Sequence, residues 1–268
     1  MVAHHLVVDV VSWGIVMEDF QGLLNGISVS PQSLPFHAWL QQQATQAMNE
    51  TASRVFPVGT ITPVSLDYWG MENQPNISAD IIERDIALST RDTMLLLGAQ
   101  DALGTETLDI LVAALLESFR KSFPDRPTIT VHNEGHGREP LDPKQDLTRT
   151  VGWFSTLSPI PLPVSLEDPT DIVSTIRWVK DIRERTPGKG RPCFAYRQLS
   201  QEGRARFQSH WPAEVIFNYH GRLQHLERKD SLLQPLEGVD SKEVGDQVPR
   251  LALFDICLLY TSPSPRDS

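Results

Sequence analysis

The stretch HHLVVDVVSW, residues 4–13, places two histidines and one aspartate in an otherwise apolar run. Histidine is the side chain whose unperturbed pKa suits proton transfer near neutral pH. His4 and His5 are adjacent, so in an extended chain they point to opposite faces and only one of them faces a given site. Asp9 stands between two valines, and a buried carboxylate without a partner is strongly unfavourable, so we expect it to be paired. The alternative is a strand with two buried histidines and one structural salt bridge.

A second cluster of ionisable residues is HNEGHGRE, residues 132–139, in which two histidines, two glutamates and an arginine surround two glycines. The glycines allow backbone and substrate to approach closely. Glu134 falls where a strand is expected to end, a position that often points into a cleft. The alternative is a polar turn on a solvated edge. His4, His132 and His136 suggest a metal, but no close ligand spacing supports a metal site.

Hydrophobic periodicity predicts a mixture of helices and strands. A helix capped by Ser12 and stopped by Gly26 is expected, and residues 57–79, rich in Pro, Gly, Asn and Ser, are the expected boundary between two subdomains. Three other helices are expected: one over 36–52, one that starts at 105, and one over 169–186. The last of these has Asp168 as its N-cap and buries Ile172, Ile176 and Val179. The expected strands are 82–90, 128–134 and 215–219.

The overall composition is that of a globular protein, with 268 residues, 40% hydrophobic and 22% charged. The net charge of −10 argues against nucleic-acid and anionic-membrane binding, which need clustered Lys and Arg. The chain starts without a signal peptide and contains no apolar run of membrane-spanning length, so we expect a cytoplasmic protein. Cys193 and Cys257 are too few for a disulfide framework or a zinc site.

The last residues, CLLYTSPSPRDS, differ in character from the rest of the chain. Residues 257–267 match the translation of the adapter used in transposase-based sequencing libraries. We therefore expect 257–268 to be an artefactual tail and exclude it from fold reasoning. The alternative is a natural tail rich in Ser and Pro. The expected organisation is residues 1–79, carrying HHxxxD, residues 80–256 as the second subdomain, and the tail.

Four segments taken in order resemble the motifs of the epimerization domain of nonribosomal peptide synthetases, most closely the fungal versions. They are HHLVVDVVSW, NEGHGRE, DLTRTVGWFSTLSPI (146–160) and EVIFNYHGRLQHLERKDSLLQ (214–234). The resemblance implies an α/β fold of the chloramphenicol acetyltransferase and condensation-domain type. In that fold two subdomains of α+β structure form a V with the active site between them.

The resemblance also implies roles for individual residues. His5 and Glu134 are the catalytic acid/base residues on opposite sides of the channel, and Tyr219 assists with protons or positions the substrate. Asp9 is structural and pairs with an arginine. The supporting residues are His4, Asp9, Ser12 and Arg138. Gly14 and His220 depart from the family pattern, in which a larger residue and Leu are usual.

The implied activity is inversion at Cα of an aminoacyl or peptidyl thioester in secondary metabolite biosynthesis. The substrate hangs from the 4′-phosphopantetheine of a peptidyl carrier protein, and no metal or other cofactor is bound directly. The expected partners are this carrier and neighbouring synthetase domains. Two alternatives stay open: a condensation domain that forms peptide bonds, and a non-catalytic module that docks carriers. The basic stretch 177–191 is either a carrier-docking surface or a solvated helix face.

The resemblance further implies that the first subdomain is incomplete, because the family has strands and helices before HHxxxD. We expect the chain expressed alone to be poorly soluble and inactive, because apolar faces and sheet edges would be left open. Residues 80–256 are expected to be the better-ordered part.

Overall fold

The computed structural model of the chain describes residues 3–4, 7–29, 33–56, 61–126, 129–162, 171–222 and 245–260. Its α-helices are α1 (Val10–Leu24), α2 (Phe36–Met48), α3 (Ala52–Val55), α4 (Thr90–Leu103), α5 (Thr107–Ser122), α6 (Ile172–Arg185), α7 (Arg191–Leu199) and α8 (Gln201–Arg206). Its short 3-10 helices are η2 (Ser78–Asp80), η3 (Pro187–Gly190) and η4 (Gln208–His210). Its strands are β1 (Thr130–Gly135), β2 (Thr156–Pro161), β3 (Ala213–Arg222) and β4 (Ala252–Tyr260).

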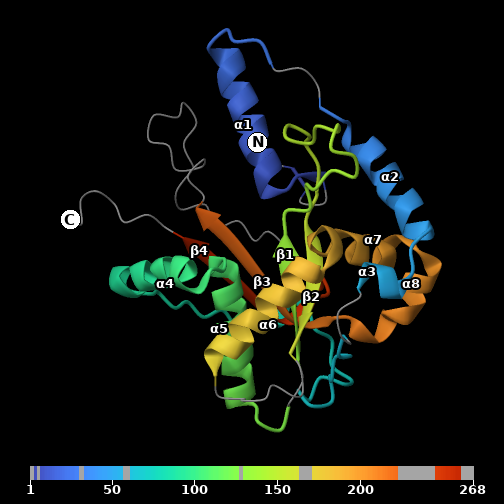
Figure 1. Cartoon of the computed structure of the whole chain (residues 1–268). Helices are drawn as coiled ribbons and strands as arrows, with labels where there is room; N and C mark the ends of the chain where they lie inside the picture. The colour runs from blue at the N-terminus through green and yellow to red at the C-terminus, as the bar shows by residue number, and fades with distance from the viewer. Residues whose placement is uncertain are drawn as a thin grey trace.

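The four strands form one mixed sheet at the centre of Figure 1, in the order β2-β1-β3-β4. Strand β1 runs antiparallel to β2 and parallel to β3, and β3 runs parallel to β4. In this register Glu134 pairs with Asn218, and Asn218 pairs with Cys257. Side chains that are paired across neighbouring strands point to the same face, so these three residues share one face of the sheet.

One face of the sheet, here called the helix face, packs against α5 and α6 (Figure 1). The strands contribute Val131, Val215 and Phe217 to this core. The apolar stripes of the two helices point at them because their residues recur every three or four positions. The buried helix residues are Val112, Ala113, Leu116 and Phe119 of α5 and Ile176, Val179 and Ile182 of α6.

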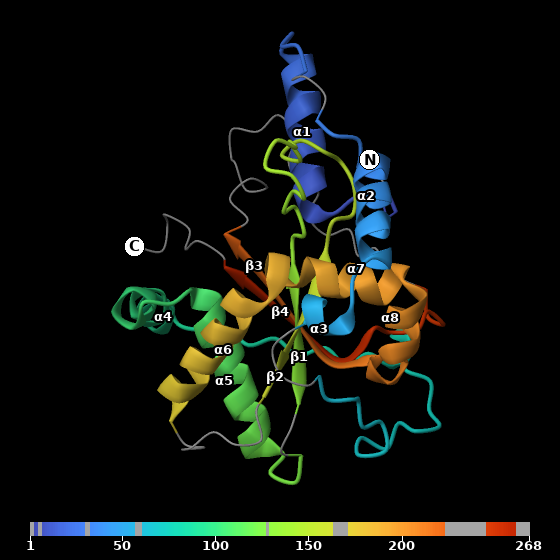
Figure 2. The ribbon, with the colours of Figure 1, turned by 45° about the vertical axis from the view of Figure 1, so that its right-hand side comes forward.

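The opposite side of the sheet, here called the second face, is covered at the start of the strands by the segment after α3. The backbone N–H of Thr62 donates to Thr130 Oγ1 (3.1 Å), and the imidazole of His210 in η4 contacts the carbonyl of Ile61 (3.1 Å). At the edge of the sheet α7 packs against β2 and α2 (Figure 2). Coverage of the second face is therefore built from irregular chain and short helices rather than from two long helices.

Helix α1 stands away from the sheet in Figures 1 and 2. Asp9 is its N-cap, since the Asp9 carboxylate accepts from the N–H of Ser12 at 2.7 Å. Ser12 was the expected cap, so the helix starts earlier than predicted. The alternative in which the HHxxxD segment forms a strand is wrong at Asp9, because this residue caps a helix. Only Ser12 and Ile15 of α1 are buried, and apolar side chains such as Leu23 and Leu24 are more than half exposed.

Other predicted elements differ at their boundaries. The helix expected over 36–52 ends earlier, at Met48, where Asn49 is the C-cap, and the separate helix α3 begins at Ala52. Helix α6 begins at Ile172 with Asp171 as its N-cap, and the expected cap Asp168 lies outside the described residues. Ile172 is 40% exposed, so its predicted burial is wrong, whereas Ile176 and Val179 are buried.

The strand predicted over 82–90 is wrong. This segment is irregular and then enters α4, whose N-terminus is capped by the Ser89 side chain. Ile82 and Ile86 are 77% and 91% exposed. The apolar side chains of this alternating segment therefore pack against no strand in the described part of the chain. The strands predicted near 128–134 and 215–219 are confirmed as β1 and the centre of β3. The α/β class is confirmed, and the boundary at residue 79 stays a prediction.

Candidate active site on the second face of the sheet

Glu134 lies near the end of β1, the position at which the sequence predicted it. Its carboxylate Oε2 accepts a hydrogen bond of 2.9 Å from the side-chain amide of Asn218 on β3. The two residues are also paired in the parallel β1–β3 register. The sheet itself therefore positions Glu134, and the Asn218 amide fixes the orientation of its carboxylate.

Asn218 rather than Tyr219 is the β3 side chain that reaches Glu134. Successive side chains of a strand point to opposite faces, and Tyr219 packs against the core of the helix face. The structure thus brings Asn218 together with Glu134 and places Tyr219 behind the sheet. The sequence could have indicated Asn218, because it lies two residues after Ile216 in the same strand. Side chains two residues apart in a strand point to the same face, here the second face.

The second face is open where β3 and β4 end. Cys257, which pairs with Asn218 in the sheet register, is exposed, and Leu259 is 54% exposed. Partial burial beside the neighbouring strand raises the pKa of the Cys257 thiol, and the negative charges of Asp255 and Glu134 add to this shift. The carboxylate of Glu134 and the thiol are therefore electrostatic neighbours on a face that solvent reaches. Cys257–Tyr260, the first part of the expected artefactual tail, extend β4.

The arginine expected to pair with Asp9 is Arg138. The Arg138 Nη2 donates to Asp9 Oδ1 at 2.9 Å and to Ser12 Oγ at 2.8 Å, and its Nη1 donates to the carbonyl of Thr150 at 2.7 Å. The side chains of Arg138 and Asp9 are 9% and 5% exposed. The HHxxxD and NEGHGRE motifs are thus joined by a buried, hydrogen-bonded ion pair.

The third motif, DLTRTVGWF, completes this connection. Ser12 Oγ donates to the carbonyl of Gly152 (2.8 Å) and accepts from its N–H (3.0 Å), and the N–H of Phe154 donates to Asp9 Oδ2 (3.2 Å). The Arg138 guanidinium also stacks over the Phe154 ring, 4.1 Å from its centroid. Sequence reasoning missed the role of Gly152, whose backbone N–H and carbonyl both bind Ser12.

The turn between Glu134 and Arg138 requires glycine at position 137. Its φ is +59°, in the left-handed region, and a Cβ there would lie 1.9 Å from the carbonyl oxygen of Phe154. The close approach expected from the two glycines is therefore made to the backbone of the third motif. The neighbouring His136 is exposed, and its Nδ1 accepts from the N–H of Arg138 at 3.1 Å.

His5 lies outside the described residues, so its arrangement opposite Glu134 stays a prediction. His4 is exposed, which excludes a role as a buried core histidine. His132 is the buried histidine of the second motif: it is 5% exposed, and burial lowers its pKa to about 3, with further contributions from Arg197 and His210. It is therefore neutral at physiological pH.

Three of the six basic residues in the stretch 177–191 make contacts inside the fold. Arg183 on α6 binds Asp109 and Glu106 (2.8 Å to the latter) at the start of α5, and Lys180 Nζ donates to the carbonyl of Gly104 at 2.7 Å. Arg191 is 5% exposed and stacks over Trp39. A docking surface in this stretch is reduced to its exposed members, Arg177, Arg185 and Lys189.

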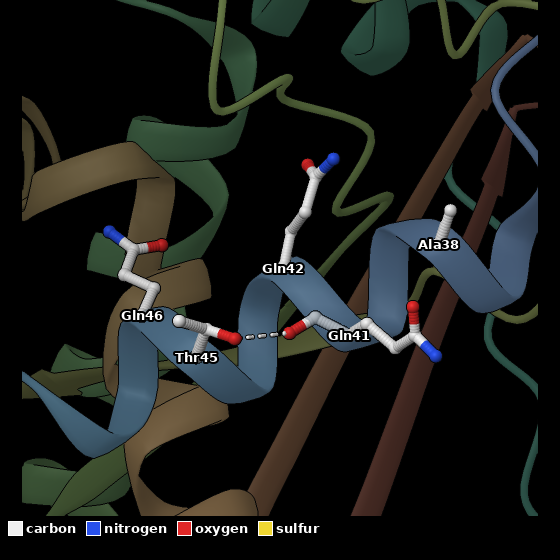
Figure 3. Close-up of a pocket in the computed structure, with 5 residues that line it drawn as sticks. All are labelled: Ala38, Gln41, Gln42, Thr45 and Gln46. Atoms are coloured by element: carbon white, nitrogen blue, oxygen red, sulfur yellow. Dashed lines mark hydrogen bonds between the residues drawn. The ribbon is translucent and has the colours of Figure 1, made fainter.

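The open hollow in Figure 3 lies along α2, and none of the predicted site residues lines it. Its lining residues are Ala38, Gln41, Gln42, Thr45 and Gln46. Among the residues that the structure describes, no three His, Cys, Asp or Glu side chains are grouped as a metal site would require. No helix in the same set is both long and apolar enough to cross a membrane.

Comparison with known proteins gives this geometry a context. The family model for the condensation domain matches residues 1–234. Nonribosomal peptide synthetase 4 of Gibberella zeae is 45% identical over 269 residues, which cover 97% of this chain but only 4% of that protein. The chain thus spans a small part of the curated relatives it matches.

Two solved structures define the fold. The epimerization domain from the third module of tyrocidine synthetase B matches with a TM-score of 0.68 and 26% identity, over 96% of this chain and 59% of that one. The first condensation domain of the calcium-dependent antibiotic synthetase matches with a TM-score of 0.51 and 14% identity, over 82% and 47%. The expected condensation-type fold is confirmed. The chain therefore belongs to the condensation domain family.

Proposed function

We propose that this chain is part of an epimerization domain. In this proposal it inverts the configuration at Cα of an aminoacyl or peptidyl thioester carried on the 4′-phosphopantetheine arm of a peptidyl carrier protein. The observation that carries the proposal is Glu134, held by Asn218 at the open end of the second face. The likeness to an epimerization domain, with a TM-score of 0.68, supports it.

Inversion at Cα needs a group that removes the proton from one face of the substrate and a group that returns a proton to the other face. The thioester assists because the carbanion delocalises into an enolate. Glu134 is the proposed acid/base on one face and His5 on the other. Asn218 positions the Glu134 carboxylate, and Tyr219 supports the strand that carries Asn218 from the helix face.

The buried ion pair supports this two-residue proposal. Asp9 follows His5 by four residues, and Arg138 follows Glu134 by four residues. Four residues of chain span at most about 14 Å between Cα atoms. Because Asp9 and Arg138 are in direct contact at 2.9 Å, the two motifs are tethered in one neighbourhood.

Peptide-bond formation is the second candidate function, because the matching family model is that of the condensation domain and HHxxxD is shared with it. A condensation reaction has no evident use for a second acid/base group on the opposite face of the substrate. Glu134 therefore favours epimerization. A module that only docks carriers would need neither His5 nor Glu134.

The test is a complete synthetase domain containing this sequence, supplied with an L-aminoacyl carrier in deuterated water. Chiral analysis of the released amino acid and mass spectrometry of deuterium at Cα measure inversion and exchange. Glu134→Gln is expected to lower inversion by roughly 10²–10⁴-fold. The matched control is Glu139→Gln, on the same loop, which should retain inversion.

The outcomes separate the three candidates. Dipeptide formation without inversion would show a condensation domain, and carrier binding without either reaction would show a docking module. Normal inversion by Glu134→Gln would remove Glu134 from the mechanism.

A further inference from the structure

Helix α2 carries no Asp, Glu, Lys or Arg in its 13 residues, although it is buried only through Trp39 and Ala47. Charged residues make up 22% of the whole chain, and α6, with 14 residues, carries six of them. Two apolar side chains of α2, Leu40 and Met48, are 42% and 68% exposed. Depletion of charge together with exposed Met is typical of surfaces that contact other polypeptides rather than of solvated helix faces.

The open hollow of Figure 3 follows this uncharged helix. Ala38, Gln42 and Gln46 project from one side of α2, because they are four residues apart, and Gln41 and Thr45 form the neighbouring row. All the residues that line the hollow are uncharged. The hollow therefore offers hydrogen bonds, but no ion pair, to a ligand.

Two carboxamides of the hollow are held in one orientation. The Oε1 of Gln46 accepts from Arg191 Nη1 at 3.1 Å, and the contacting atom is oxygen because arginine only donates. The Oε1 of Gln42 accepts from Nε2 of Gln145 at 2.8 Å, and Gln145 Oε1 in turn accepts from the N–H of Asp142 at 3.4 Å. Both amide oxygens thus bind the protein, and neither Nε2 donates to a residue that the structure describes. Two oriented N–H₂ groups remain for a ligand.

The spacing of these two donors matches an extended polypeptide. Residues four apart in an α-helix are separated by about 6 Å along its axis. The carbonyl groups on one edge of an extended chain recur every two residues, or about 6.6 Å. Gln42 and Gln46 can therefore donate to two such carbonyl groups of a segment that lies along α2. Thr45 Oγ1, which donates to the Gln41 carbonyl at 2.9 Å (Figure 3), keeps lone pairs that can accept from an N–H of the segment.

An anionic ligand fits this hollow less well than a neutral backbone. The nearest cation that contacts a lining residue is Arg191, which is 5% exposed and already donates to Gln46. A phosphate or carboxylate in the hollow would lose water without gaining a counter-ion. Peptide carbonyls require only the neutral N–H donors that Gln42 and Gln46 present.

We propose that the hollow on α2 binds an extended connecting segment of the same synthetase polypeptide, from outside residues 1–268. The chain corresponds to only 4% of nonribosomal peptide synthetase 4 of Gibberella zeae, and a polypeptide of that length joins its domains by connecting segments. A few neutral hydrogen bonds bind a free peptide weakly. A segment tethered to the same chain has an effective concentration in the millimolar range, so the same bonds hold it in place.

This docking proposal goes beyond catalysis and does not depend on it. None of the residues proposed for proton transfer lines the hollow. Loss of segment binding and loss of inversion are therefore measured by different assays on different variants, and the failure of one proposal leaves the other standing.

The first test is photo-cross-linking in the intact synthetase, with p-benzoylphenylalanine in place of Gln41. This residue is exposed and lines the hollow. The control has the same probe in place of Gln198, which is exposed on α7 and does not line the hollow. Mass spectrometry of the digested protein is expected to show one connecting segment of the same polypeptide joined to position 41 and not to position 198.

The other occupants give different products. Cross-links from position 41 that are confined to residues 1–268, that reach a folded neighbouring domain or that join a second copy of the protein would overturn the proposal. Absence of any cross-link from position 41 would also overturn it.

The second test removes the outward donors and keeps the inward contacts. Gln42→Glu and Gln46→Glu retain an oxygen for Gln145 and Arg191 but replace the N–H₂ group by an acceptor. A synthetic peptide of the cross-linked segment is titrated calorimetrically into the complete domain from which that segment has been removed. The double variant is expected to bind this peptide roughly tenfold more weakly, because two hydrogen bonds are lost.

Gln198→Glu is the matched control, since it adds a negative charge outside the hollow and should bind the peptide like the unmodified domain. An unchanged urea midpoint of the double variant shows that its fold is retained, and Thr45→Val, which removes only the hydroxyl acceptor, provides a second variant of the hollow. Equal affinity of the double variant and the unmodified domain would refute recognition by Gln42 and Gln46. Lack of binding to the unmodified domain at millimolar peptide would refute the docking itself.

Discussion

Replacing Arg138 by Gln is expected to destabilise the chain strongly. The substitution removes a cation that is 9% exposed on its side chain and is bonded to the equally buried Asp9. It also removes the bonds from the guanidinium to Ser12 Oγ (2.8 Å) and to the carbonyl of Thr150 (2.7 Å). Asp9 keeps the N–H donors of Ser12 and Phe154 but loses its counter-ion.

The size of the effect follows from the burial of the pair. Removing one partner of a buried ion pair typically costs about 3–5 kcal/mol, because the other charge is left without compensation. For a domain of this size about 1 kcal/mol corresponds to roughly 2–4 °C in Tm. Arg138→Gln should therefore lower Tm by roughly 6–20 °C.

Urea unfolding of a complete synthetase domain containing this sequence, followed by tryptophan fluorescence, measures this free energy. The matched control is Arg250→Gln, which breaks the exposed Arg250–Asp255 pair, with side chains 26% and 48% exposed, and should cost less than about 1 kcal/mol. The double variant Asp9→Asn with Arg138→Gln should recover part of the loss, since the uncompensated charge is gone. A loss for Arg138→Gln no larger than the control would refute the argument that this ion pair joins the motifs.

Three further predictions follow from individual residues. His132 has a pKa of about 3 in the folded chain against 6.5 unfolded, so the unfolded chain binds the proton first. Between pH 6.5 and about 3, stability should therefore fall by roughly 1.4 kcal/mol for each pH unit, and urea titrations of His132→Phe should lack this component. Iodoacetamide should label Cys257 and spare Cys193, whose buried thiol has a pKa of about 12, as mass spectrometry of the digested chain would show. Gly137→Ala should lower Tm because of its φ of +59° and the contact at 1.9 Å, whereas Gly14→Ala, with nothing within 4 Å of the added Cβ, should stabilise α1 by about 0.5–1 kcal/mol.

Local periodicity was enough to predict elements that bury a regular stripe. Helix α5 follows from the spacing of its apolar residues, and β1 from its alternation up to Glu134. The strand expected over 82–90 failed because alternation alone does not supply a partner, and Ile86 is 91% exposed. Helix α4, which follows it, has no buried residue and so gave no clear stripe.

The candidate site was predictable in its residue types and less so in its contacts. The motifs identified Glu134 and the need of Asp9 for an arginine, but not that Arg138 supplies it. Tyr219 was selected from its motif, and Asn218 was not considered. The contact of Asn218 with Glu134 depends on the face to which each β3 side chain points, and this face is known only once β3 is paired with β1.

The contacts that hold the site join distant parts of the chain. Glu134 and Asn218 are 84 residues apart in sequence, and Asp9 and Arg138 are 129 apart. Contacts of such separation slow folding, because loop closure must be completed before they contribute. The helix face can assemble from α5 and nearby strands, whereas the Glu134 carboxylate acquires its amide partner only when β3 docks in parallel beside β1. In a refolding experiment native α-helical circular dichroism should therefore return before protection of the Asn218 amide from hydrogen exchange.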